Sequence, residues 1–217
     1  MTIKIKNLVL QNNVFVAPMA GVTDLAYRLI LREFNAGLVY TEMISDKGLL
    51  YHNKKTLEMV EIKEYERPIA LQIFGSDLDS MVKAARYIDQ NTDCDIIDIN
   101  MGCPVPKVTK TGAGAKLMTT PEHAYKIVKA VVDVVEKPVS VKIRIGWDHQ
   151  NINAVSFAKK MEEAGAAMIV VHGRTKSDLY SGKVNKEVIK AVKEALKIPV
   201  IANGDIKMPE DAKEMLE

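Results

Sequence analysis

The chain has 217 residues, of which 47% are hydrophobic and 27% charged, as expected of a soluble globular protein with a core of its own. A formal net charge of +2 is too small to predict nucleic-acid binding by itself, and no apolar run approaches the roughly 18 residues of a membrane span. The two cysteines, Cys94 and Cys103, match neither a disulfide framework nor a zinc site. These features predict a cytoplasmic protein with no membrane or metal partner, and they leave its oligomeric state open.

Short runs rich in Val and Ile alternate with longer amphipathic segments along the chain. In residues 1–13, polar and apolar residues alternate as in a β-hairpin, and the segment lacks the apolar run of a signal peptide. The apolar runs then predict seven strands, at 14–18, 36–43, 67–75, 94–100, 137–146, 166–173 and 198–205. The segments between them predict helices, most clearly at 76–90, 120–136, 151–165 and 185–197. Pro121 suits the first turn of one helix, and Gly165 suits the residue that follows another.

A strand-then-helix repeat fits either a doubly wound open sheet or a (β/α)8 barrel, and in both the ligand binds at the carboxyl ends of the strands. Polar or charged residues follow the strands in every repeat, whereas a doubly wound sheet concentrates its site at one switch point. We therefore expect an α/β fold of the TIM (β/α)8 type. The barrel is expected to be incomplete, with about seven βα units, because the chain stops within the seventh helix, at 209–217.

Cys103 lies between Gly102 and Pro104, where the strand at 94–100 ends. A lone cysteine is usually a small buried hydrophobe, and Cys94, at the other end of the strand, fits that description. Gly102 lets the backbone approach a ligand closely, so the position favours a functional thiol at Cys103. Since an unperturbed thiol has a pKa of about 8.5, Cys103 is mainly protonated near pH 7 and can act as a general acid as readily as a nucleophile.

Lys142 and Arg144 alternate with apolar residues on one strand, so both side chains point to the same side. In an outer sheet that side would be a solvated face. In a barrel it is the interior, where two cations predict an anionic or polar ligand at the rim. His172 is either a satisfied core residue or a ligand contact, and Gln72 either a buried amide or a donor to a heterocycle. Asn203, Gly204 and Asp205 form either a binding loop or a simple turn.

Two loops carry weaker signals. Residues 111–118 (TGAGAKLM) lack the full dinucleotide-binding glycine pattern and are as consistent with a flexible loop as with a phosphate-binding one. Residues 174–183 (RTKSDLYSGK) place Arg174 and two lysines around Tyr180. This arrangement is typical of a solvated loop but also suits RNA, with cations on phosphates and a ring for stacking.

Taken together, seven stretches resemble the tRNA-dihydrouridine synthases, most closely the bacterial B-type branch. They are VFVAPMAGVTDLAYR (14–28), YTEMIS (40–45), RPIALQIFGSD (67–77), DIIDINMGCPVPKV (95–108), VSVKIRIGW (139–147), VVHGRTKSDLYSGK (170–183) and PVIANGDI (199–206). They occur in family order and cover nearly the whole chain. Dihydroorotate dehydrogenases share the fold and the cofactor but not this set of motifs.

The resemblance implies an FMN-dependent oxidoreductase that reduces uridines in tRNA to 5,6-dihydrouridine, with NADPH as electron source. Hydride would pass from flavin N5 to C6 of the uracil, and Cys103 would protonate C5. Asn100, Arg144 and Arg174 would contact the substrate, whose base must leave its stack to reach the pocket. The flavin contacts implied are Pro18, Met19, Ala20, Gln72, Lys142, His172, Asn203, Gly204 and Asp205. No metal site is implied.

In domain terms, residues 1–217 are expected to form a partial FMN-binding TIM-barrel catalytic domain, with the hairpin of residues 1–13 at the barrel bottom. The family continues into an eighth strand that binds the FMN phosphate and a C-terminal helical domain that grips tRNA, and neither is found in the sequence. Two other readings stay open. The chain could reduce a free pyrimidine, or it could be a catalytically silent fragment that retains RNA binding.

Overall fold

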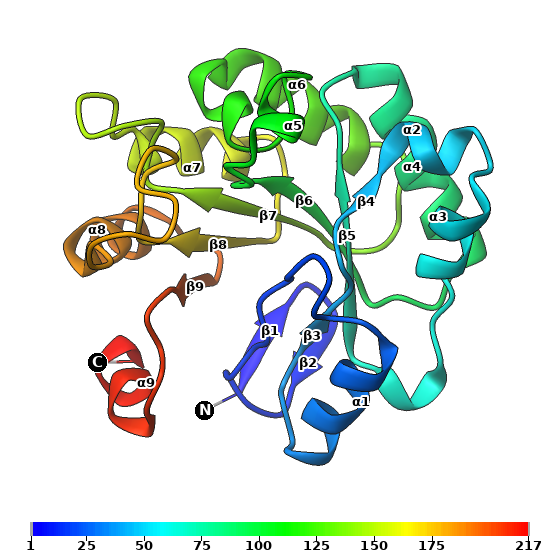
Figure 1. The fold of residues 1–217 in the computed structure, drawn as a ribbon, viewed down its shortest axis with the longest axis horizontal. Coiled ribbons are helices and arrows are strands. Elements are labelled where there is room, and N and C mark those ends of the chain that lie inside the picture. The colour runs from blue at the N-terminus through cyan, green and yellow to red at the C-terminus, as the bar shows by residue number, and fades with distance from the viewer. Residues whose placement is uncertain (1, 217) are drawn as a thin grey trace.

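The structure, a computed structural model, describes residues 2–216 and is a curved parallel sheet with helices around its outer face (Figure 1). The strands are β1 (Ile3–Ile5), β2 (Leu8–Leu10), β3 (Val39–Tyr40), β4 (Ile44–Ser45), β5 (Ile69–Phe74), β6 (Ile96–Met101), β7 (Val139–Arg144), β8 (Met168–His172) and β9 (Val200–Asn203). The α-helices are α1 (Leu25–Glu33), α2 (Asp46–Leu50), α3 (Lys54–Met59), α4 (Leu78–Asn91), α5 (Pro106–Thr109), α6 (Pro121–Val132), α7 (Ala154–Glu163), α8 (Lys186–Ala195) and α9 (Pro209–Leu216). Two 3₁₀ helices, η1 (Glu64–Glu66) and η2 (Gly114–Thr119), complete the set.

The main sheet has the order β3-β5-β6-β7-β8-β9, with β4 also paired to β5, and all of these pairs are parallel. Its strands follow chain order and its helices lie outside the curve (Figure 1), which is the arrangement of a partial TIM barrel and not of a doubly wound sheet. The predicted fold class is therefore confirmed. β1 and β2 form a separate antiparallel hairpin.

The prediction of a strand at 14–18 is wrong in its length, because only one residue of this segment pairs with the sheet. A single parallel bridge joins Phe15 to Leu38, supported by the bonds from Gly37 N to Val14 O (2.8 Å) and from Val16 N to Leu38 O (2.9 Å). Pro18 has no N–H to donate, so the ladder stops before it. The run predicted at 36–43 is likewise reduced to the two residues of β3, because the chain leaves the ladder before it forms β4.

The sheet separates two apolar cores. Side chains on its outer face pack against the helices in the larger core, which includes Leu71, Ile99 and Val141. Alternate residues face inward and form a smaller core with the hairpin, made up of Ile5, Leu10, Leu38, Tyr40, Ala70, Ile96, Ala167, Met168 and Val170. Ala70, Ile96 and Met168 of this core lie at the starts of β5, β6 and β8, so the hairpin packs against the amino end of the sheet.

The helices predicted at 76–90, 120–136, 151–165 and 185–197 are present as α4, α6, α7 and α8. Pro121 is the first residue of α6, and Gly165 follows α7 with a φ of 99°, as the sequence predicts. Within residues 2–216, no helix combines the length and the apolar character that crossing a membrane requires.

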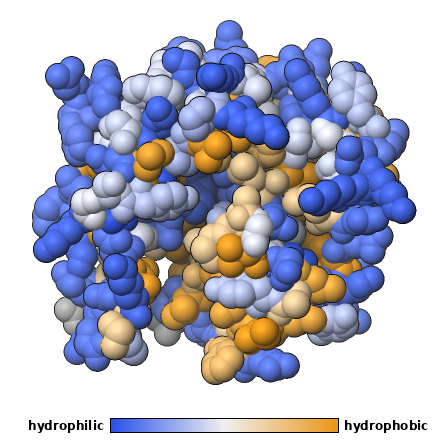
Figure 2. Space-filling model, viewed as in Figure 1, coloured by the Kyte–Doolittle hydropathy of each residue, from blue (hydrophilic) through white to orange (hydrophobic). Residues whose placement is uncertain are grey.

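Figure 2 shows a mostly hydrophilic surface with apolar side chains gathered over the region of α1. Val22, Leu25, Ile30 and Phe34 contribute there, and Phe34 is 81% exposed. This apolar area borders the segment of Met19, whose carbonyl accepts a hydrogen bond from Val22 N at 3.1 Å.

Candidate active site

A polar layer lies above the inward-facing apolar core, toward the carboxyl ends of the strands. Successive inward positions change from Ile96 to Asp98 and Asn100 on β6, and from Val170 to His172 on β8. The strand register places Gln72 beside Asp98, Asn100 beside Lys142, and His172 between Arg144 and Asn203. Among the residues singled out from the sequence, Gln72, Asn100, Lys142, Arg144, His172 and Asn203 therefore lie on neighbouring strands of one sheet.

Cys103 lies on the turn that follows β6, at the same end of the barrel, and it is partly exposed. Hydrogen bonds from two different segments fix the conformation of this turn. Asn100 Oδ1 accepts hydrogen bonds from Cys103 N (2.8 Å) and Gly102 N (3.1 Å), and Cys103 O accepts one from Ala115 N (3.0 Å). Burial raises the pKa of the Cys103 thiol, so it carries its proton at neutral pH.

The segment at 111–118 is not the flexible loop considered from the sequence. Its second half forms η2, with Ala113, Ala115 and Leu117 buried against the rest of the protein. Gly114 has a φ of 60°, and a Cβ there would lie 2.7 Å from Cys103 O. The segment therefore packs directly on the Cys103 turn, a role that the glycines signalled but that sequence reasoning missed.

A continuous chain of hydrogen bonds leads to this turn from inside the barrel. Gln72 Nε2 donates to Asp98 Oδ2 (2.7 Å), and Asn100 Nδ2 donates to Gln72 Oε1 (2.8 Å). Ser140 Oγ donates to the other oxygen of Asp98. Asp98 is fully buried, and desolvation raises its pKa to about 6 despite these donors. Sequence reasoning had not singled out Asp98, because one acidic residue inside an apolar run gives no sign of its partners.

Lys142 and His172 both belong to the polar layer, on the neighbouring strands β7 and β8. Lys142 Nζ donates to Asn203 Oδ1 (2.9 Å), and burial lowers the pKa of the ammonium group to about 8. Burial and the nearby charges of Lys142, Arg144 and Arg174 together lower the pKa of His172 to about 3. His172 is consequently neutral at neutral pH.

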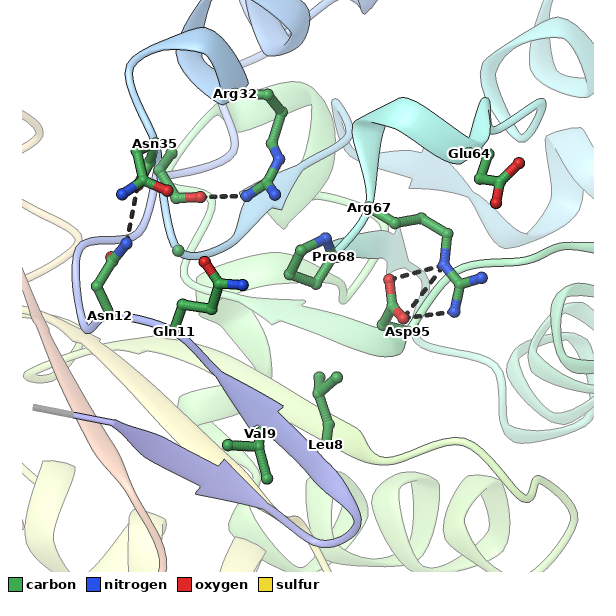
Figure 3. Close-up of a pocket in the computed structure, with 12 residues that line it drawn as sticks. Leu8, Val9, Gln11, Asn12, Arg32, Asn35, Glu64, Arg67, Pro68 and Asp95 are labelled. Carbon is green, nitrogen blue, oxygen red and sulfur yellow. Dashed lines mark hydrogen bonds and ion pairs between the residues drawn. The ribbon is translucent and has the colours of Figure 1, made fainter.

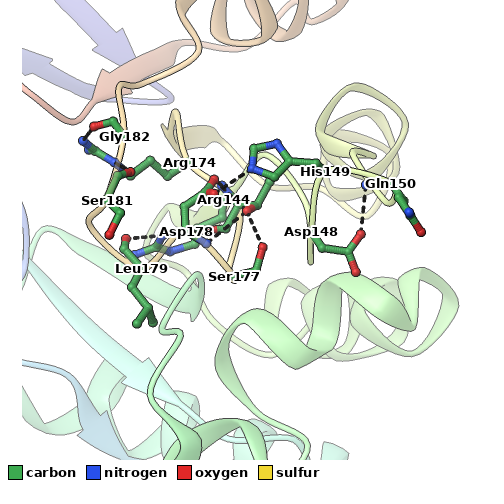
Figure 4. Close-up of polar contacts among 11 residues, drawn as sticks. Arg144, Asp148, His149, Gln150, Arg174, Ser177, Asp178, Leu179, Ser181 and Gly182 are labelled. Atoms are coloured by element: carbon green, nitrogen blue, oxygen red, sulfur yellow. Dashed lines mark hydrogen bonds and ion pairs between the residues drawn. The ribbon is translucent and has the colours of Figure 1, made fainter.

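The two predicted arginines are engaged by the protein itself (Figure 4). Arg144 donates to three backbone oxygens, of Gly102 (2.9 Å), Thr175 (2.7 Å) and Leu179 (2.7 Å). It thereby ties the Cys103 turn to the loop at 174–183. Arg174 is 5% exposed and donates to Ser181 O and Gly182 O within that loop.

The loop after β9 closes against the same group of side chains. Asp205 pairs with Arg174 at 2.9 Å and accepts from Val184 N (3.1 Å), and Asp205 and Gly204 both have positive φ. A Cβ on Gly204 would lie 2.7 Å from the His172 ring. The turn geometry considered for residues 203–205 is thus present, and it also places the loop against His172.

Pro18, Met19 and Ala20 lie in an accessible segment that leads into a tight turn, in which Thr23 Oγ1 accepts from Met19 N at 3.1 Å. Gly21 N, just beyond, donates to the Glu42 carboxylate. This segment follows the Phe15 bridge and so leaves the sheet at the carboxyl end.

A separate groove of about 370 Å³ lies at the opposite end of the barrel (Figure 3). It is lined by the hairpin, by the end of α1 and by residues near the start of β5. Arg67 and Asp95 pair across 2.7 Å within it, so its most prominent charges satisfy each other. None of the predicted site residues lines this groove.

In residues 2–216, no three His, Cys, Asp or Glu side chains are grouped so as to hold a metal ion.

Residues 15–217 match the family described as Dihydrouridine synthase (Dus). The chain belongs to this family. The dihydrouridine synthase match covers every strand of the main sheet and the turn that carries Cys103.

Two relatives illustrate the similarity within the dihydrouridine synthases. The tRNA-dihydrouridine synthase B of Vibrio vulnificus (strain CMCP6) is 46% identical over 215 residues, which are 99% of this chain and 66% of that protein. A probable tRNA-dihydrouridine synthase of Rickettsia bellii (strain RML369-C) is 44% identical over 216 residues, again 99% of this chain and 66% of that protein. The chain therefore spans just under two thirds of the length of these curated relatives.

Solved structures support the fold. A variant of NCR from Zymomonas mobilis superposes with a TM-score of 0.71 at 14% identity, covering 99% of this chain and 81% of that one. Morphinone reductase in complex with tetrahydroNAD superposes with a TM-score of 0.62 at 13% identity, covering 100% of this chain and 82% of that one. At such low identity the likeness concerns the fold alone.

Proposed function

We propose that this chain is the catalytic region of an FMN-dependent enzyme that reduces uridines in tRNA to 5,6-dihydrouridine, with NADPH as the electron source. The observation that carries the proposal is the position of Cys103, held by Asn100 at the carboxyl end of the barrel in a chain 46% identical to a tRNA-dihydrouridine synthase B. Lys142, His172 and Asn203 lie at the same end of the neighbouring strands.

The side chains of the polar layer suit an isoalloxazine ring. Lys142 Nζ has three N–H groups, and Asn203 Oδ1 is the one acceptor it meets among residues 2–216, so two remain for a ring carbonyl or nitrogen. Gln72 Nε2 likewise keeps one N–H after its bond to Asp98. The Lys142 charge would stabilise negative charge on a reduced ring. Pro18, Met19 and Ala20 would line one side of the ring, and Asn203, Gly204 and Asp205 would border it.

When bound and reduced, FMN supplies the hydride that adds to C6 of the uracil. The residues of the chain supply the rest. Cys103 Sγ holds the proton that adds to C5, so the C5=C6 double bond gains one hydride and one proton and the thiolate is reprotonated from solvent. Its raised pKa keeps that proton in place until the carbon acquires negative charge.

We assign Asn100, Arg144 and Arg174 to the substrate side of the site. Beyond its bond to Gln72, Asn100 Nδ2 donates only to Met43 Sδ at 3.9 Å, a weak acceptor that a uracil carbonyl would replace. The Arg144 guanidinium lies 5.6 Å from the centre of the Tyr180 ring, which is 76% exposed and available to stack on a base. Arg174, held by Asp205, would act by fixing the loop that carries Tyr180.

Purified protein tests the proposal directly. We expect a yellow protein whose flavin absorbance is bleached by NADPH under anaerobic conditions and restored by unmodified tRNA, with dihydrouridine found in the tRNA by mass spectrometry. Restoration by free uracil or orotate without RNA would instead identify a reductase of free pyrimidines. Colourless protein that binds tRNA and does not take up added FMN would contradict the proposal and indicate RNA binding without catalysis.

A further inference from the structure

The hydrogen-bond chain from Asp98 to Cys103 has a direction. An ionised carboxylate only accepts, so Asp98 Oδ2 requires the NH2 group of Gln72, which it meets at 2.7 Å. The Gln72 carbonyl must then point the other way, to Asn100 Nδ2 at 2.8 Å. As a result Asn100 turns its own carbonyl toward the N–H groups of Gly102 and Cys103.

Without such an anchor, each of the two side-chain amides has two orientations of similar shape. In the reversed orientation Asn100 would present NH2 to two backbone N–H groups, and neither hydrogen bond to the turn could form. Asp98 is the acceptor that selects one orientation for both amides. It is fully buried, and its second oxygen is occupied by Ser140.

We propose that Asp98 is a positioning residue that fixes the backbone of Cys103 through the amides of Gln72 and Asn100. The consequence for catalysis rests on the proposed function, in which Cys103 supplies a proton. The structural claim does not, because it concerns backbone hydrogen bonds of the protein without flavin or tRNA.

Amide hydrogen exchange of Gly102 and Cys103 reports on these bonds. In Asp98→Leu, which has no acceptor for Gln72, we expect both amides to exchange at least about tenfold faster than in the parent. In Asp98→Asn the new carbonyl can still accept from Gln72, while the Ser140 hydroxyl rotates to accept from the new NH2 group. We expect this variant to keep both amides protected to within about threefold.

Ser140→Ala is the matched control, because it removes a hydrogen bond from the same carboxylate but not the one that orients Gln72. It should leave the exchange of Gly102 and Cys103 unchanged. The amide of Ile97, which donates to Pro138 O in the sheet at 3.0 Å, reports in every variant on whether the strand itself is intact.

Protection of Gly102 and Cys103 that survives in Asp98→Leu would overturn the proposal, as would equal loss in Ser140→Ala or in Asp98→Asn. If Asp98→Leu does not fold, Gln72→Met tests the proposal instead, because this substitution removes the amide that links Asp98 to Asn100 and keeps a side chain of similar volume. Faster exchange of both amides in that variant supports the proposal, and parental exchange overturns it. A protein that fails to reduce tRNA while showing this exchange pattern would count against the proposed function alone.

Discussion

Lys142 Nζ donates a hydrogen bond to Asn203 Oδ1 across 2.9 Å, although β8 separates their strands in the sheet. The contact spans the concave side of the sheet and requires the curvature of a barrel. It also leaves an ammonium group in an interior position, where one amide oxygen is its hydrogen-bond partner and the buried Asp98 carboxylate is the opposing charge that most favours its protonated form.

This burial predicts a pH dependence of stability. The Lys142 pKa is about 8 in the folded protein against a usual 10.5, so between these values the unfolded chain binds the extra proton. Stability therefore rises with pH across this window, by up to about 3 kcal/mol, and below it the charged group is a constant cost. Lys142→Met does not titrate. In urea titrations between about pH 7 and about pH 11, we expect the free energy of unfolding of the parent to rise by about 3 kcal/mol relative to that of Lys142→Met. Parallel curves for the two proteins would contradict the burial of this charge.

The ring of His172 should remain neutral well into acid. Desolvation and three neighbouring cations hold its pKa at about 3, far below the usual 6.5. In NMR spectra we expect its ring carbon and proton shifts to stay constant between about pH 8 and about pH 5. His172→Gln identifies the resonance by its loss. A titration midpoint near the ordinary value would show that the ring is solvated or that the surrounding cations lie elsewhere.

The regular part of this structure could be predicted from the sequence, because it depends on short-range patterns. Runs of Val and Ile marked β5 to β9, and the alternation of Lys142 and Arg144 with apolar residues indicated which side faced inward. The position of Cys103 at a strand end followed from the same reasoning. The strand predicted at 14–18 was too long, because a proline ends the ladder after a single bridge.

The polar partners of the site could not be predicted, because they depend on loop conformations that no periodic pattern encodes. Arg144 and Arg174 were expected to face substrate, yet Arg144 donates three hydrogen bonds and Arg174 two to backbone oxygens of the loop at 174–183 and of the Cys103 turn. The orientation of the Asn100 amide depends on Asp98, two side chains away. Only the glycines at 112 and 114 hinted that the segment at 111–118 has a fixed conformation.

Gly204 provides a test of the packing around His172. An alanine there would adopt a φ of 113° and place its Cβ 2.5 Å from Val184 Cγ1 and 2.7 Å from His172 Cδ2. We expect Gly204→Ala to lower the free energy of unfolding by about 2–4 kcal/mol, from backbone strain together with overpacking. Gly182→Ala is the matched control, with a φ of 68° and no atom within 4 Å, and should cost only about 1–2 kcal/mol. Equal losses in denaturant titrations would show that the loop does not pack on His172.

The role of Cys103 is the central claim, and rapid-mixing kinetics on Cys103→Ala tests it most directly. We expect the variant to bind FMN and to be reduced by NADPH at the parental rate, while its flavin is re-oxidised by unmodified tRNA about 10²- to 10⁴-fold more slowly, the usual loss on removing a general acid. Cys94→Ala, which alters the buried thiol at the other end of β6, should re-oxidise like the parent. Re-oxidation of Cys103→Ala by tRNA at the parental rate would contradict the account.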